Sequence, residues 1–137
     1  MKINITNMAE AMEDKTLMKG LYTVEVVNAK ILQTRRGFDQ LVLNMVVQDG
    51  PAQLDGRSPV GTEVADFIIL DENASDKPKG PAFIRQRVGN VFGAFEVPAG
   101  AEDEHVFVGK MALAQIEPGE DQDGFPRDVV KRYRKAL

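Results

Sequence analysis

The sequence places two arginines and a phenylalanine around a single glycine, between two apolar runs. In "ILQTRRGFDQLVLNMVV" (residues 31–47), Arg35 and Arg36 precede Gly37, and Phe38 follows it. Glycine readily adopts the positive φ that tight turns need, so the stretch predicts a β-hairpin whose tip carries these side chains. Exposed guanidinium groups bind phosphates, and an exposed aromatic ring stacks on an unpaired base. The hairpin tip therefore has the chemistry of a contact to single-stranded nucleic acid.

A second group of cationic and aromatic residues lies near the C-terminus. Phe125 and Arg127 end an acidic turn, and Lys131 and Tyr133 continue along "FPRDVVKRYR", which predicts a strand. Each group also has a purely structural explanation. An arginine pair in a hairpin is often only a solvated turn, and a phenylalanine at the start of a strand often packs into the core. The two groups form one binding site only if the fold brings them to the same face of the protein.

The charges of the chain are segregated along the sequence. The net charge is −4, yet basic residues collect in residues 30–40, 76–87 and 127–135, whereas acidic residues collect in residues 63–72 and 102–123. An acidic average therefore does not exclude a polyanionic ligand. The 137 residues contain no cysteine, which excludes disulfides, thiolate zinc sites and cysteine nucleophiles.

Catalytic and metal chemistry find little support in the sequence. His105 follows the acidic residues 102–104, but hydrated carboxylates on a loop form no fixed coordination shell, and a solvated histidine is favoured. Asp66, Asp71 and Glu72 could be imagined as a two-metal nuclease cluster, although the adjacent pair beside "NASDKP" is typical of a turn. There is no P-loop and no G-x-S-x-G motif. We expect a protein that is not an enzyme and has no cofactor, no metal site and no catalytic residues.

The first 18 residues contain no long apolar segment and no small-residue cleavage site, so no signal peptide is expected. They include a weak helical pattern in "MAEAMEDK". No stretch approaches the roughly 18 uninterrupted apolar residues that a membrane span requires. We expect a cytoplasmic protein without a membrane partner, located in the host cytoplasm if the protein is viral.

The periodicity of the remaining chain predicts five strands and one helix. Alternating residues such as Tyr22, Val24 and Val26 indicate a half-buried first strand, which Asn28 and Ala29 interrupt as a bulge would. In the second strand one face is apolar, and the other, with Gln40 and Val42, is mixed. The helix has a single apolar stripe, Ile84, Val88, Val91, Phe92 and Phe95. The strands are expected near 20–33, 38–48, 62–70, 108–117 and 125–132, and the helix near 81–95.

Five strands with a helix between the third and fourth is the element order of an OB-fold, a five-stranded Greek-key barrel. We therefore expect an all-β protein with one helix, a single domain over residues 1–137 with an extension at 1–18 and a short basic tail at 134–137. An unrelated five-stranded barrel and a split α+β sheet stay open as alternatives. In an OB-fold the ligand lies on strands two and three, between the loop joining strands one and two and the loop joining strands four and five. Here these loops are "TRRGF" and "EPGEDQDGFPR".

The chain also resembles the small single-OB-fold single-stranded DNA-binding proteins of bacteriophages and prophages. The resemblance covers roughly residues 19–133 as a set of weak motifs, among them "GLYTVEVVNAKILQTRRGFDQLVLNMVVQDG", "ADFIIL", "FIRQRVGNVFGAF" and "VGKMALAQIE". It implies binding of single-stranded DNA without sequence preference, in replication, recombination or repair. The residues expected to contact nucleic acid are Arg35, Arg36, Phe38, Gln40, Phe125, Arg127, Lys131 and Tyr133.

The resemblance also bears on partners. Many of these proteins recruit replication partners through a flexible acidic tail, whereas this sequence ends in the basic "KRYRKAL". Either the internal acidic residues 102–104 serve instead, or such recruitment is absent. Replication or recombination proteins are candidate partners, and a homo-oligomer is compatible with the sequence. The main alternative is a structural or protein-interaction barrel, such as a virion assembly component or a replisome adaptor, that does not bind nucleic acid. Its interface would be the half-apolar face with Phe38, Val42 and Val46.

Overall fold

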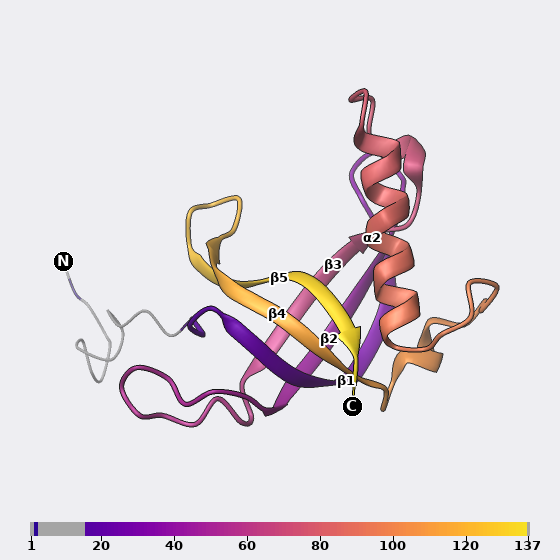
Figure 1. Cartoon of the computed structure of the whole chain (residues 1–137). Helices are drawn as coiled ribbons and strands as arrows, with labels where there is room; N and C mark the ends of the chain where they lie inside the picture. Colours follow the sequence, from indigo (N-terminus) through magenta and orange to yellow (C-terminus); the bar gives the residue numbers. More distant parts are fainter. Residues whose placement is uncertain (1, 3–15, 137) are drawn as a thin grey trace.

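The structure, a computed structural model, describes residue 2 and residues 16–136, so the helical pattern in "MAEAMEDK" lies outside the described residues. Within them, no helix is long and apolar enough to cross a membrane. Figure 1 shows a twisted sheet with one long helix standing beside it. The elements are β1 (Gly20–Gln33), β2 (Asp39–Asp49), β3 (Glu63–Ile69), the 3₁₀ helix η1 (Glu72–Ala74), α2 (Gly80–Ala94), the 3₁₀ helix η2 (Glu104–Phe107), β4 (Met111–Glu120) and β5 (Pro126–Lys135).

All five strands belong to one sheet, in the order β3-β2-β1-β4-β5, and every neighbouring pair is antiparallel. The prediction of a mostly β protein with one helix between the third and fourth strands is therefore confirmed. β3 and β5 form the two edges of the sheet. Among the described residues no backbone ladder joins these edges, although the two strands contact each other. The sheet is curled like a small barrel but is not closed, so the OB assignment itself stays a prediction.

β1 pairs with a different neighbour along each of its two edges and contains a bulge. It pairs with β2 along most of its length, and with β4 through Gly20–Glu25 only. The β1–β2 register shifts between Val26 and Asn28, which leaves Val27 as the extra residue of a bulge. The sequence predicts an interruption next to this position, at Asn28 and Ala29. A bulge increases the local twist and lets one long strand serve both halves of the sheet.

β2 separates an apolar face from a mixed face, as its alternation predicts. The four side chains of the apolar face are all buried in the core: Leu41, Leu43, Met45 and Val47. On the mixed face, Gln40, Asn44 and Val46 are half-buried. Val42 differs, because it is only 2% exposed and its cross-strand partner on β3 is Phe67. Much of the apolar surface on this face of β2 is therefore buried within the chain and is not available to a protein partner.

α2 contacts both edge strands and completes the core between them. Pro81 occupies the first turn, where its missing N–H has no intrahelical partner to lose. Ile84, Val91 and Phe95 are buried, as the predicted stripe requires. The other two members, Val88 and Phe92, are half-buried and pack against the same core.

β4 and β5 begin and end later than the sequence predicts. Residues 108–110 form a turn, in which Gly109 has a φ of 84°, so β4 starts at Met111. β4 then continues through Pro118, which is tolerated because, among the described residues, β4 pairs only with β5 beyond Ile116. At the C-terminal end β5 includes Arg134 and Lys135, which pair with β4. The expected basic tail is therefore largely strand.

A buried ion pair joins β3, β5 and α2. Asp66 is 4% exposed, and its two carboxylate oxygens accept hydrogen bonds from Arg87 Nη2 at 2.6 and 2.5 Å. The Tyr133 hydroxyl donates to the same carboxylate at 2.6 Å. Burial, followed by the adjacent Asp66 charge, raises the pKa of Tyr133 well above its usual value. These contacts link the two sheet edges that the backbone leaves unpaired.

Candidate functional site

The β1–β2 hairpin holds two arginines in solvent. Thr34 closes the turn, because its amide donates to the Phe38 carbonyl at 2.8 Å and its hydroxyl accepts from the Phe38 amide at 3.1 Å. Gly37 has a φ of 85°, as predicted for this turn. Arg35 and Arg36 are exposed, and the Arg36 guanidinium carbon lies 5.4 Å from the centre of the half-buried Phe38 ring. This distance is within reach of a cation–π contact, so cation and ring form one surface unit.

A groove of about 750 Å³ lies between the outer face of β3 and the turn that joins β4 to β5. Phe67 of β3 lines it and is 44% exposed. The guanidinium carbon of Arg127, on β5, lies 5.8 Å from the centre of the Phe67 ring. Gln40 of β2 also lines the groove. Two of the sequence-predicted residues, Gln40 and Arg127, thus border one groove together with an exposed aromatic ring.

Phe67 is a candidate that the sequence analysis missed. In β3, the residues Val64, Asp66 and Ile68 are buried, so Ala65 and Phe67 lie on the opposite face. A phenylalanine on the outer face of an alternating strand is the signal that could have identified it. The signal was hidden because the inward position beside Phe67 belongs to an aspartate, Asp66, which in a sequence favours a solvent-facing position.

The wall of the groove that the β4–β5 turn and the start of β5 form is acidic and carries Asp121, Asp123 and Asp128. Glu63 of β3 adds a fourth carboxylate on the opposite wall. Asp121 Oδ1 accepts from the amides of Asp123 and Phe125 at 2.9 Å each, and Asp128 Oδ1 accepts from the Leu17 amide at 2.7 Å. These backbone donors offset part of the negative charge, yet the wall still disfavours phosphate groups. A nucleic acid in the groove would place bases or sugars against this wall and its phosphates near the cations.

The β4–β5 turn carries another exposed aromatic ring, Phe125, which is not among the residues that line the groove. The Asp121 amide donates to the Phe125 carbonyl at 2.9 Å, and Gly124 adopts a φ of 81° within the turn. Phe125 is 65% exposed, and Arg127 follows two residues later. An aromatic ring this exposed gains little from the core, so its free face is available to a ligand.

Lys131 and Tyr133 do not share one face, which corrects the placement of Tyr133 on the binding surface. Two consecutive β4 residues pair with Val130 and Arg132, so Lys131 is the extra residue of a bulge. The bulge shifts the alternation of side chains by one position. Lys131 is exposed, whereas Tyr133 points into the core and is 2% exposed. Its ring packs against the Phe95 ring at a centroid distance of 5.1 Å, so the ring is not accessible for a base to stack on it.

The carboxylates considered as a nuclease cluster each have a structural contact. Asp66 is bound to Arg87 and Tyr133, as described above. Asp71 accepts from the backbone amide two residues further on, at 2.9 Å. Glu72 accepts from an Arg85 guanidinium nitrogen at 2.8 Å. The three side chains thus serve three separate local contacts.

Asp103, Glu104 and His105 form the one group, within the described residues, whose ligand atoms could meet at a single cation. Asp103 Oδ1 accepts from the His105 amide at 2.9 Å and lies 2.9 Å from the His105 ring nitrogen Nδ1. The backbone hydrogen bond, followed by the contact with the ring, lowers the pKa of Asp103. The start of η2 accounts for these contacts, because Asp103 is its N-cap residue.

Comparisons with known proteins assign no family to the chain. No protein-family model matches it, and no curated protein matches it significantly. A function for this chain is therefore argued from its own residues and their geometry.

Proposed function

We propose that this protein binds single-stranded DNA without sequence preference and acts in phage-type DNA replication, recombination or repair. The observation that carries the proposal is the pairing of Phe67 and Arg127 across the groove. An exposed ring and an adjacent cation are what a single strand requires, because bases stack on the ring and phosphates follow the cation. Arg36 and Phe38 repeat the same pair on the β1–β2 hairpin.

An OB-type arrangement supports the proposal. The long bent β1 pairs with β2 and β4, and the helix lies between β3 and β4 in the sequence. The groove lies against β2 and β3, and the β4–β5 turn forms one of its walls. OB-folds bind oligonucleotides on this same face and beside this same loop. We therefore assign the curled sheet to the OB class as part of the proposal.

Single strands suit the site better than duplex. Stacking on Phe67, Phe125 or Phe38 requires bases whose faces are free, and in a duplex these faces are covered by neighbouring base pairs. The groove is also lined by four carboxylates, which oppose the phosphates of a second strand. Arg127 is the one cationic residue that lines the groove in the described part of the chain, so we expect binding to depend on stacking as much as on charge.

A labelled oligothymidylate should bind more tightly than a duplex of equal length, and an oligonucleotide of mixed sequence should bind about as tightly as the oligothymidylate. The affinity should fall as salt rises, because neutralised phosphates release their counterions. Fluorescence anisotropy at two salt concentrations measures all of these quantities. Equal affinity for duplex and single strand, or an affinity independent of salt, would reject the proposal.

The double variant Arg35→Ala with Arg36→Ala tests the hairpin tip. We expect a weaker affinity for single strands and a log–log salt slope flatter by up to about 1.4, for two phosphate contacts of roughly 0.7 each. The melting temperature should stay nearly unchanged, because both side chains are exposed. Arg57→Ala, which removes an exposed arginine from the β2–β3 loop, is the control and should leave the slope unchanged. A double variant that binds like the parent would remove the hairpin from the binding surface.

A further inference from the structure

We infer that the pocket between α2 and β5 is a second nucleotide subsite, which binds a phosphate of the strand through Lys131 and Arg132 and stacks a base on Phe83. The inference deepens the proposed function and rests on it. The pocket has a volume of about 270 Å³. Its lining residues are Phe83, Gln86, Arg87, Asn90, Lys131 and Arg132.

The pocket differs from the groove in charge. Three of its six lining residues are cationic and none is acidic, whereas four carboxylates line the groove. Lys131 lies 3.4 Å from the Glu117 carboxylate, but its side chain keeps 52% exposure. Arg132 is exposed and has no acidic partner among the residues that the structure describes. Phosphate groups, which the acidic wall disfavours, are therefore drawn towards the pocket.

Arg87 lines the pocket but is bound mainly to Asp66. Its Nη2 is bound to Asp66, which neutralises most of its charge. Its Nη1 is buried and has no hydrogen-bond partner in the described part of the chain. A buried donor without an acceptor is unfavourable, so the hydrogen bonding of Arg87 is incomplete in this structure, and the phosphate contact is assigned to Lys131 and Arg132 alone. The Asn90 side-chain amide, by comparison, has a partner for each of its two polar atoms. Its Nδ2 donates to the Tyr133 carbonyl and its Oδ1 accepts from the Tyr133 amide, each at 2.9 Å.

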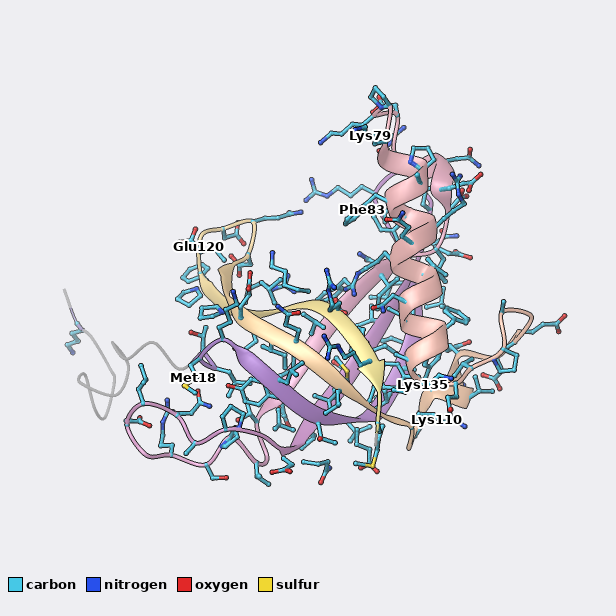
Figure 2. The ribbon with its side chains drawn as sticks, in the orientation of Figure 1. Met18, Lys79, Phe83, Lys110, Glu120 and Lys135 are labelled. Carbon is cyan, nitrogen blue, oxygen red and sulfur yellow. The ribbon has the colours of Figure 1, made fainter. Side chains whose placement is uncertain are left out.

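Phe83 supplies the stacking surface. It is 68% exposed on α2, outside the apolar stripe that faces the core. Figure 2 shows it on the side of α2 that faces the β4–β5 hairpin, where Glu120 is labelled. The helix does not need a phenylalanine at this position for packing. An exposed aromatic ring that lines the same pocket as Lys131 and Arg132 has the composition of a site for one nucleotide.

β5 connects the pocket to the groove. Arg127 lines the groove and Lys131 lines the pocket, and the four residue steps from one to the other cover about 13 Å of strand at roughly 3.3 Å per step. A single strand that follows β5 therefore reaches the pocket after leaving the groove. A short oligonucleotide occupies the groove alone, whereas a longer one occupies both sites.

Tryptophan reporters separate the two sites, because the chain has no tryptophan of its own. Phe67→Trp reports on the groove, and Phe83→Trp reports on the pocket. We expect an oligothymidylate of about four nucleotides to quench only the groove reporter, and one of about ten nucleotides to quench both. If the long oligonucleotide quenches the groove reporter but leaves the pocket reporter unchanged, the subsite is rejected and the proposed function stands. If neither reporter responds and no binding is detected, the proposed function is rejected as well.

Arg132→Ala tests the phosphate contact. We expect it to weaken binding of the long oligonucleotide at least about fivefold and to leave binding of the short one unchanged. Arg134→Ala is the matched control, since Arg134 is an exposed arginine on the same strand but lines neither the groove nor the pocket. The subsite would be overturned if Arg132→Ala and Arg134→Ala lost the same affinity, or if Arg132→Ala lost the same affinity for the short and the long oligonucleotide. Either result would show that β5 contributes only diffuse charge.

Discussion

Asp66→Ala should lower the free energy of unfolding by about 3 kcal/mol, which is the largest stability effect that we expect in this protein. Removing one partner of a buried ion pair typically costs 3–5 kcal/mol, because the other charge stays buried without compensation. The lower end applies here, since the Arg87 side chain keeps 18% exposure and can turn partly towards water. The Tyr133 hydroxyl also loses its acceptor. Urea denaturation monitored by circular dichroism measures the change.

Glu72→Ala provides a matched control, because Glu72 of η1 also pairs with an arginine of α2. Glu72 pairs with Arg85 at 2.8 Å, but the two side chains keep 46% and 60% exposure. An exposed pair of this kind contributes less than about 1 kcal/mol. If the two variants lose similar stability, the Asp66 contacts do not hold the sheet edges together. Asp66→Asn is a second test, because it removes the charge and keeps a side-chain oxygen as an acceptor for the tyrosine hydroxyl.

The secondary structure follows from residue periodicity because each element buries one face. The stripe on α2 and the apolar face of β2 appear where a period of 3.6 or 2 requires them. Strand ends were harder to predict, because they depend on pairing. Pro118 looks like a turn residue in the sequence, but it fits within β4 because β5 is the only described strand that pairs with β4 at this point.

The candidate site was predicted only in part, because its residues meet through the curl of the sheet. Arg127 and Phe67 belong to opposite edges of the sheet, and no short-range pattern relates them. Tyr133 was misplaced for a different reason. A strict alternation of side chains would put Tyr133 on the same face as Lys131. The bulge at Lys131 reverses this placement, and no sequence pattern indicates the bulge. The buried Asp66 was equally unexpected, since its partner Arg87 comes from a helix 21 residues away.

Phe67→Ala is expected to produce the largest loss of binding. Stacking contributes about 1–3 kcal/mol per base, so a loss of about tenfold in affinity for single-stranded DNA is expected. The salt slope should stay nearly the same, because stacking releases no counterions. Phe67 also pairs with the buried Val42 across the strands, so the alanine variant can lose some stability. Anisotropy titrations should therefore be accompanied by a melting curve for each variant.

Substitutions that keep the bulk of Phe67 separate stacking from packing. Phe67→Leu keeps an apolar side chain beside Val42 but removes the ring, so it should bind as weakly as Phe67→Ala while melting like the parent. Phe67→Tyr keeps the ring and should bind like the parent. Leu54→Ala removes a fully exposed apolar side chain from the β2–β3 loop, outside the groove, and should change nothing. If Phe67→Leu binds as tightly as the parent, the ring serves only to cover Val42, and the groove is not where bases stack.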